Sequence, residues 1–472
     1  MGRFGCKGLL LLGSMIMLGG VAQAQYLRSS YFMEGTSARL QLNPGLQPTK
    51  GYFNMPIIGS FNMSASSNVL GTSDIIDLMN SGSDLYSNDK LFDRLKTDNR
   101  LNVNLNTDIL SFGWYRGKGF WSFNVGLRAD FGAALAKDMF SMMRTMNGFA
   151  LEDVAGTNQS YSLSDQTLNM RAYAEVGLGY SRRITEKLTV GARVKVLLGL
   201  ARAEMNINRF DLNLDIPNLN YAGYESRGEL SPSDWYGKGY SYAAEGNVIT
   251  TLKGGGMTFD NNGMIDNFDL DAGDLGIAGS GFGIDLGASY KVWDNLTVSA
   301  SILDLGFLKW KESETTVATV SGAENVTITS DNYDHYIGGD FLSFERFDFA
   351  EGSPEKVKTK TRLYSTLLLA GEYGLLNNKL SVGAMYTARF VEPKTLNELT
   401  FMATFRPKNW FNAAISYSPI QSSGKSIGLA VKLGPLFVGT DYMFFGSNSK
   451  SVNGFLGISF PLGGKPKPFS EL

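Results

Sequence analysis

The stretch Phe282-Gly-Ile-Asp-Leu-Gly-Ala-Ser-Tyr-Lys-Val292 alternates strictly between two kinds of side chain. Every second residue is apolar or aromatic, and the residues between are Gly, Asp, Ser or Lys. Because successive side chains of a strand point to opposite faces, one face suits hydrocarbon and the other suits water. The same alternation recurs in most strand-like segments of the chain, with small and charged residues on the polar face. The pattern therefore predicts a β-barrel that stands in a membrane.

Fourteen segments fit this description, and most have the roughly ten residues that a tilted membrane strand needs. The fold class that we predict is all-β: one transmembrane antiparallel β-barrel of about 14 strands over residues 52–460. The predicted strands are residues 52–64, 100–116, 120–132, 168–183, 188–210, 282–293, 296–310, 360–374, 379–391, 397–406, 410–418, 426–433, 436–445 and 451–460.

The connections between these segments alternate in length. Tight turns are predicted at residues 117–119, 184–187, 294–295, 375–378, 407–409 and 434–435, whereas residues 65–99, 133–167, 211–281 and 311–359 form long loops. Outer-membrane barrels place short turns in the periplasm and long loops outside. An even strand number then brings both termini to the periplasmic side. Short helices are expected in the loops, near residues 75–79, 91–95 and 133–149.

Aromatic residues recur beside the tight turns. Trp114, Trp121, Trp293 and Trp410 all fall at this level. Rings at this depth are typical of the girdle that lies among lipid headgroups. Cross-strand packing of ordinary hairpin aromatics is the alternative interpretation.

The N-terminus predicts export. Residues 1–24 combine Arg3 and Lys7 with an apolar stretch and the cleavage pattern Ala22-Gln-Ala24, which is typical of a signal peptide. Cys6, the one cysteine, lies inside it, so the mature chain cannot form disulfides. Removal of Arg3 and Lys7 leaves 41 basic against 45 acidic residues, a net charge of −4, which argues against a nucleic-acid partner. We expect the outer membrane of a Gram-negative bacterium, with residues 461–472 as a periplasmic tail.

No signature of an enzyme stands out. His335, the one histidine, lies in a predicted loop, and a base or nucleophile would need an oriented partner. No His/Glu cluster has metal-ligand spacing. We therefore predict no catalytic residue, no metal and no cofactor.

Charged residues on the polar strand faces are expected to point into the barrel lumen. They support two interpretations, a salt-bridged network that fills the interior or a lining for a solute. The set is Arg128, Asp130, Arg171, Glu175, Arg193, Lys195, Asp285, Lys291, Arg362, Glu372 and Arg389.

A predicted loop helix carries methionines at helical spacing. Met139, Met142, Met143 and Met146, with Phe140, could adapt to an apolar ligand because thioether side chains are flexible. The alternative is packing of the helix onto the barrel rim or into its mouth.

The segment before the first strand contains Asn43-Pro44-Gly45-Leu46 after a small-residue stretch that begins at Glu34. It resembles the N-terminal signature of FadL-like outer-membrane proteins, in which Asn-Pro-Ala precedes the first of fourteen strands; here Gly45 replaces the Ala. The layout is also similar to a family of uncharacterised Bacteroidetes outer-membrane barrels known as a domain of unknown function. The resemblance implies an N-terminal hatch over residues 25–51, a capture site for apolar ligands among the outer loops, and a passage for them.

We therefore expect passive uptake or binding of a small hydrophobic solute. The alternative is a barrel scaffold that docks a secreted or surface protein, similar to the type IX secretion shuttles of the same superfamily, or that acts in cell-surface assembly. Expected partners are outer-membrane lipid, a small apolar ligand, and a secreted or periplasmic protein in the alternative case.

Overall fold

The computed structural model describes most of the chain. The described ranges are residues 28–33, 37–56, 59–71, 73–74, 89–147, 158–217, 231–271, 273–337, 349–391, 394–421, 424–443 and 450–463. The predicted signal peptide, the predicted helix at residues 75–79 and most of the predicted tail lie outside these ranges.

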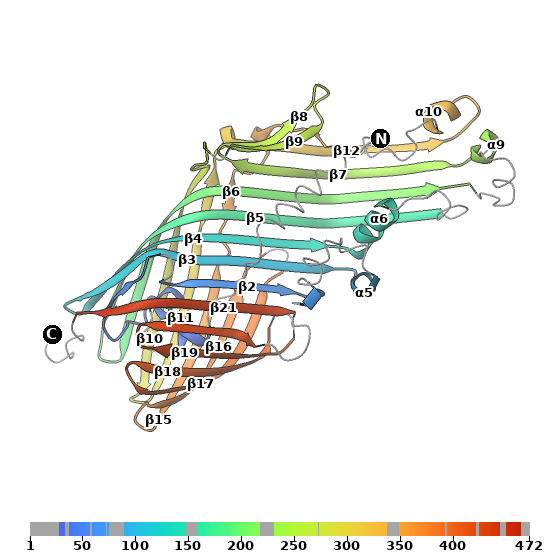
Figure 1. Cartoon of the computed structure of the whole chain (residues 1–472). Coiled ribbons are helices and arrows are strands. Elements are labelled where there is room, and N and C mark those ends of the chain that lie inside the picture. Colours follow the sequence, from blue (N-terminus) through green and yellow to red (C-terminus); the bar gives the residue numbers. More distant parts are fainter. Residues whose placement is uncertain are drawn as a thin grey trace.

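Fourteen antiparallel strand positions close into one barrel (Figure 1). The ring closes where β21 pairs with both pieces of the first position, for example Phe53↔Phe460 and Met63↔Gly454. In order, the positions are β1/β2 (Gly51–Asn54, Phe61–Ser67), β3 (Asn99–Arg116), β4 (Gly119–Leu135), β5 (Asn158–Arg183), β6 (Leu188–Asp215), β10 (Gly279–Trp293), β11 (Leu296–Trp310), β14/β15 (Lys360–Arg362, Thr366–Leu375), β16 (Leu380–Arg389), β17 (Leu396–Lys408), β18 (Phe411–Ile420), β19 (Ser426–Leu433), β20 (Leu436–Met443) and β21 (Ser451–Leu462).

Two strand positions are interrupted where continuous strands were expected. The first breaks between β1 and β2, and the eighth breaks at residues 363–365 between β14 and β15. At the eighth position β11 pairs first with β15 and then with β14, across a distortion at Asp304, whose φ is +57°. Alternation does not reveal such breaks, because the side chains on either side keep the same character.

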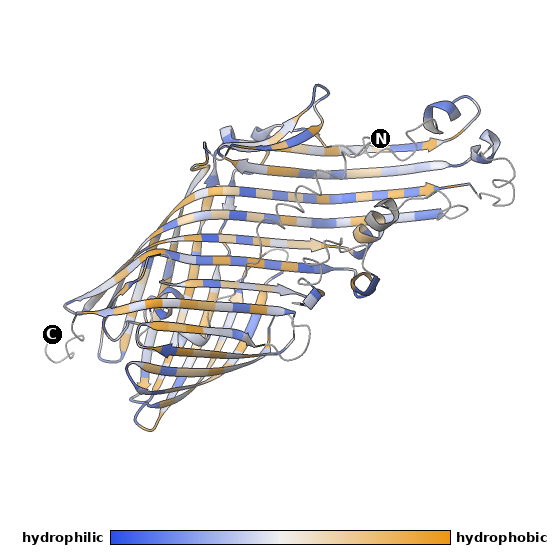
Figure 2. Cartoon of the chain, viewed as in Figure 1, coloured by the Kyte–Doolittle hydropathy of each residue, from blue (hydrophilic) through white to orange (hydrophobic). Residues whose placement is uncertain are grey.

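Hydrophobic and hydrophilic residues alternate along most strands (Figure 2), and the apolar side chains are the exposed ones. On β10, Phe282, Leu286 and Tyr290 are 42–44% exposed, whereas Asp285 between them is fully buried. Leu, Val, Ile and Phe side chains on the other strands share this outward exposure. In a closed single-layer barrel, an apolar exterior with a polar interior is the arrangement that a membrane requires. The fold points to the outer membrane of a Gram-negative bacterium. In the described part of the chain, no helix is long and apolar enough to span a membrane.

A flat sheet continues beyond the barrel on the long-loop side (Figure 1). β6 pairs with β10 up to Gly199, and from Ala201 onward it pairs instead with β7 (Gly239–Leu252). β7 pairs in turn with β12 (Thr315–Thr327), and β8 (Gly255–Phe259), β9 (Ile265–Leu270) and β13 (Ala350–Glu351) add short pieces. Two of the predicted long loops, residues 211–281 and 311–359, therefore contain strands of this sheet.

The described helices are short and lie along the sheet extension, beside the ends of the barrel strands or inside the barrel. α6 (Lys137–Asn147) occupies the position of the predicted methionine helix, and its first turn follows directly on β4. α5 (Asp89–Phe92), α9 (Pro232–Trp235) and α10 (Tyr333–Ile337) lie in the outer connections (Figure 1). α2 (Arg28–Tyr31) and α3 (Ala38–Leu42) belong to the segment that fills the barrel.

Candidate functional site

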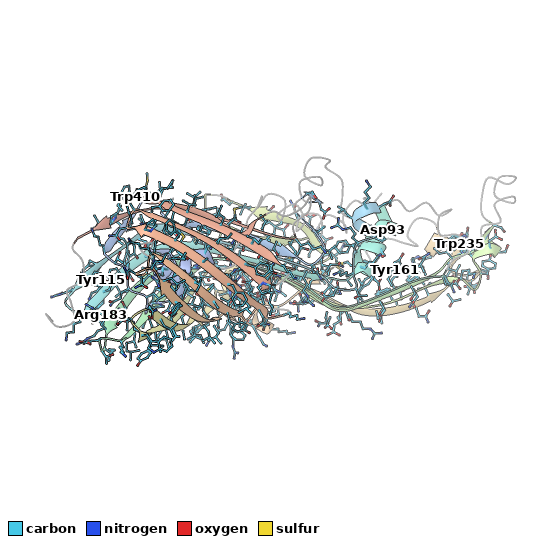
Figure 3. All side chains as sticks on the ribbon, turned by 90° about the horizontal axis from the view of Figure 1, so that it is seen from below. Asp93, Tyr115, Tyr161, Arg183, Trp235 and Trp410 are labelled. Atoms are coloured by element: carbon cyan, nitrogen blue, oxygen red, sulfur yellow. The ribbon has the colours of Figure 1, made fainter. Side chains whose placement is uncertain are left out.

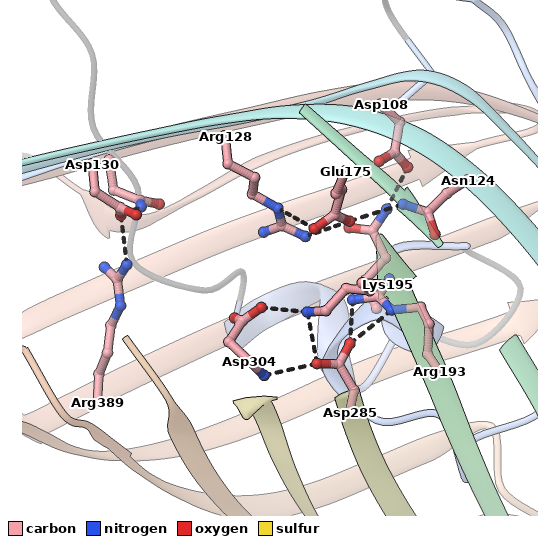
Figure 4. Close-up of polar contacts among 12 residues, drawn as sticks. Asp108, Asn124, Arg128, Asp130, Glu175, Arg193, Lys195, Asp285, Asp304 and Arg389 are labelled. Atoms are coloured by element: carbon pink, nitrogen blue, oxygen red, sulfur yellow. Dashed lines mark hydrogen bonds and ion pairs between the residues drawn. The ribbon is translucent and has the colours of Figure 1, made fainter. Parts of the chain in front are cut away.

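Buried charges of β6, β10 and β11 meet in the barrel interior (Figure 4). Lys195 Nζ lies 2.7 Å from Asp285 Oδ1 and also contacts Asp304, while Arg193 Nη2 lies 2.6 Å from Asp285 Oδ2. The Asp304 backbone N–H donates to Asp285 Oδ1 at 2.7 Å. Lys195 and Asp285 are completely buried. Each charge thus has at least one opposite charge, which a buried ion needs to offset its desolvation.

A second ion pair joins the neighbouring strands β4 and β5. Arg128 donates to Glu175 through Nε at 3.0 Å and Nη2 at 3.1 Å, and Asn124 Nδ2 donates to Glu175 Oε1 at 2.8 Å. Two parallel N–H···O bonds fix a guanidinium firmly. This pair and the Lys195 cluster form one charged region, which we call the ion network.

A third contact crosses the lumen. Arg389 Nη2 on β16 lies 2.7 Å from Asp130 Oδ1 on β4 (Figure 4). Close by, the Arg171 guanidinium lies 3.7 Å from the ring centre of Tyr364, a residue of the break between β14 and β15. These side chains join opposite walls, so the interior is narrow at this level. The adjoining polar cavity, lined in part by Asn62 and Tyr173, has a volume of about 20 Å³, which is space for one water.

The remaining predicted lumen residues divide into two groups. Glu372 is buried and contacts Arg406 at 2.7 Å and Arg39 at 3.8 Å. Lys291 and Arg362 are exposed, near opposite ends of the barrel, and no ion pair joins either to the ion network among the described residues. The contacts favour the interpretation of a paired interior over that of free charges along an open lumen.

Residues 28–33 and 37–50 lie inside the barrel, and we call them the N-terminal segment. Its apolar side chains, including Tyr31, Phe32 and Leu42, pack against Leu368 and Met402 of the inner wall. The Tyr31 hydroxyl lies 2.7 Å from Ser299 Oγ, and Ser301 Oγ donates to the Leu42 carbonyl at 2.7 Å. The segment therefore packs against the inner wall; a hatch over residues 25–51 stays a prediction.

The Asn43-Pro44-Gly45 motif sits directly on the wall. The Asn43 amide is fully buried; it donates to the carbonyls of Ala288 at 3.3 Å and Ala300 at 3.2 Å, and accepts from the Gly45 N–H at 2.8 Å. A Cβ on Gly45 would lie 2.8 Å from the Ala288 backbone. This close approach explains the Gly at the position where the resembling family has Ala. Gly191 leaves similar room for Pro44.

The start of the N-terminal segment is held by a residue that the sequence did not single out. Asp441 on β20 accepts hydrogen bonds from the backbone N–H groups of Arg28 at 3.0 Å and Ser29 at 2.8 Å. The Arg28 side chain continues to Glu398 at 3.3 Å and Ser418 at 2.8 Å. Asp304 was missed in the same way. Each is an acid inside a strand, next to apolar or aromatic residues, and that signal could have found both.

An apolar cluster lies on the long-loop side, where α6 covers the sheet extension. Met139 of α6 is 2% exposed and packs with Leu163, Met205, Ile207 and Met257. Phe131, Phe210, Phe259 and Phe268 are partly buried against the same cluster, and Met142 bridges to a neighbouring one around Trp235. Phe140 is half-buried, and the side chains of Met143 and Met146 lie outside the described part of the structure. Met139 thus packs against the sheet extension, and both expected roles of the methionine helix stay predictions.

A family model matches the chain over residues 44–441, with the description "Family of unknown function (DUF5723)". The chain belongs to this family. The match runs from Pro44 to Asp441 in β20 and so covers most of the barrel. It agrees with the expected likeness to an uncharacterised barrel family.

Solved structures similar to the DUF5723 chain include hydrocarbon channels. The toluene transporter TbuX of Ralstonia pickettii is 13% identical with a TM-score of 0.40, covering 94% of this chain and 96% of that one. The toluene transporter TodX of Pseudomonas putida is 12% identical with a TM-score of 0.38, covering 93% and 94%. At such identities and TM-scores these neighbours say nothing of the solute of this chain. No curated protein matches the sequence.

Proposed function

We propose that this DUF5723 protein takes up a small apolar solute at the apolar cluster under α6 and passes it towards the membrane or the periplasm without an energy source. The observation that carries the proposal is the composition of the cluster. Four methionine or aliphatic side chains from four elements, Met139, Leu163, Met205 and Met257, meet several phenylalanines beside the barrel mouth.

Methionine and phenylalanine suit a site that must open around a guest. The thioether chain has no branch and rotates freely, so it fills irregular shapes, and it makes favourable contacts with aromatic rings. A small aromatic or aliphatic solute could take the place of side chains that now fill the cluster. Passive exchange needs nothing more than a concentration gradient.

The ion network lies deeper in the barrel than the apolar cluster, and it limits the onward movement of a bound solute. Charged, paired side chains offer no favourable environment to an apolar solute. Passage would therefore require the N-terminal segment or the Asp130–Arg389 contact to move. We assign the gating role to these two elements as part of the proposal.

Binding of radiolabelled toluene to the purified protein in detergent micelles, corrected for empty micelles, tests the proposal. Met205→Gln places a polar amide in the cluster and is expected to weaken binding at least several-fold. Met402→Gln is the matched control, since Met402 is also a buried methionine on a barrel strand, in a different apolar cluster. Equal binding by the wild type and the Met205 variant would contradict the proposed site, and the absence of binding by the wild type would contradict the proposed function.

A further inference from the structure

The short-turn end of the barrel carries a set of exposed cations. Within the described ranges, no ion pair joins any of them to an acid. They are spread over four turns rather than gathered at one. The set, which we call the basic rim, is Arg116, Arg182, Lys187, Lys379 and Lys408.

Cross-strand register places two of these cations beside aromatic rings on the outer face. Trp114, Trp121 and Tyr180 occupy one row across β3, β4 and β5. Arg116 and Arg182 flank Gly119 in the row two residues closer to the turn. Because side chains two residues apart share a strand face, both arginines lie on the same side as Trp114 and Tyr180, about 7 Å further towards the turn.

The exposure of these aromatic rings indicates that they face the membrane. Trp114 is 42% and Tyr180 37% exposed, and Trp121 lies 4.6 Å from Tyr180, centre to centre. Amphipathic rings of this kind occupy the boundary between hydrocarbon and headgroups. The next row outward is then at the depth of the headgroup phosphates, where a long Arg or Lys side chain reaches its polar surroundings.

Exposed tryptophans lie at other turns as well. Trp410, two residues after Lys408, is 55% exposed, and Trp293 is 62% exposed. Figure 3 shows Trp410, Tyr115 and Arg183 at the same end of the barrel, away from Trp235. In these four turns the one exposed acid is Glu186, against five cations of the rim.

We propose that the basic rim binds the phosphate groups of anionic phospholipids in the membrane leaflet on the short-turn side. A protein partner would need one concentrated patch. The rim instead follows the turns between the second and third, fourth and fifth, eighth and ninth, and tenth and eleventh strand positions. Only a continuous surface such as a leaflet meets cations distributed in this way. Attraction to anionic lipid acts near the surface and weakens with salt.

Lipid retention by the full-length protein tests the proposal. The protein is reconstituted in equal amounts of phosphatidylglycerol and phosphatidylcholine with matched acyl chains, extracted in mild detergent, and analysed for bound lipid by native mass spectrometry. The wild type is expected to retain phosphatidylglycerol several-fold over phosphatidylcholine. Arg116→Gln/Arg182→Gln should reduce that preference by half or more.

The matched control is Lys356→Gln/Lys358→Gln, which removes two exposed cations at the long-loop end and should leave the preference unchanged. Arg116→Lys/Arg182→Lys, which keeps the charges, should also retain it. Equal retention of the two lipids by the wild type overturns the proposal. So does an unchanged preference in the double Gln variant. Because the wild type alone gives a decisive result, poor folding of a variant does not remove the test.

Discussion

Arg389 and Asp130 form an ion pair at 2.7 Å between β16 and β4, the ninth and third positions of a fourteen-strand ring. The two strands lie six positions apart in one direction and eight in the other, so the contact joins nearly opposite walls. An arginine side chain spans only about two strand spacings of 4.8 Å. The barrel must therefore be flattened at this level, and the lumen is crossed by the pair.

Breaking this contact should open the lumen. Arg389→Gln removes the cation and leaves Asp130 with its neighbour Asn104. We expect a higher ion conductance of single barrels in planar bilayers, and a loss of stability on the order of 3 kcal/mol. Arg209→Gln is the control, because its ion pair with Asp211 lies on the sheet extension outside the barrel. Conductance equal to that of the wild type would show that another element closes the lumen.

Lys195 should be essential for the stability of the barrel. Lys195→Met leaves Asp285 and Asp304 with less compensating charge in a buried site, at a cost of about 3–5 kcal/mol. The temperature at which the folded, fast-migrating band disappears on gels measures the effect. Lys379→Met, an exposed lysine in a turn, should change that temperature little. A similar small shift for Lys195→Met would mean that water or rearrangement compensates the acids.

Gly45 should not tolerate a side chain. Gly45→Ala brings a Cβ to 2.8 Å from the Ala288 backbone, so the N-terminal segment must shift from the wall, at a cost of about 1–3 kcal/mol. We expect greater permeability to small hydrophilic solutes in liposome-swelling assays. Gly371→Ala makes the same change where no atom lies within 4 Å and should behave as wild type. Unchanged permeability of the Gly45→Ala variant would show that the backbone at Ala288 moves and the N-terminal segment stays in place.

Asp441 should hold the start of the N-terminal segment. Asp441→Ala leaves the N–H groups of Arg28 and Ser29 without their acceptor, and each unsatisfied buried donor costs about 1–3 kcal/mol. Trypsin, which cuts after arginine, should then reach Arg28 and Arg39 in the folded protein. Limited proteolysis with mass spectrometry measures this cleavage. Asp211→Ala, on the sheet extension, should leave both sites protected, and protection in the Asp441 variant would contradict its anchoring role.

Turns were more accurately predicted than the interruptions of strands. β5 ends at Arg183 and β6 begins at Leu188, which leaves residues 184–187 as the predicted turn. Turn residues and alternation are local signals, so their reading does not depend on contacts with the rest of the chain. The break at residues 363–365 was missed because it depends on β11 changing partners from β15 to β14 at Asp304.

A local sequence pattern could not predict which charges form pairs either. The sequence indicated that Lys195 and Asp285 face inward, yet it left open whether they line a passage or neutralise each other. Asp304, 109 residues after Lys195 in the chain, completes their cluster through a backbone distortion that has no counterpart in the alternation.

By itself, the sequence determined the number of strands, their inward and outward faces, and the end of the barrel that carries the short turns. Each of these follows from side-chain periodicity and turn chemistry within about ten residues of chain. The tertiary structure alone decided that Arg389 meets Asp130 and that Asn43 meets Ala288. Such contacts depend on the register with which fourteen strands close and on the flattening of the ring, and both are set by the packing of the whole barrel.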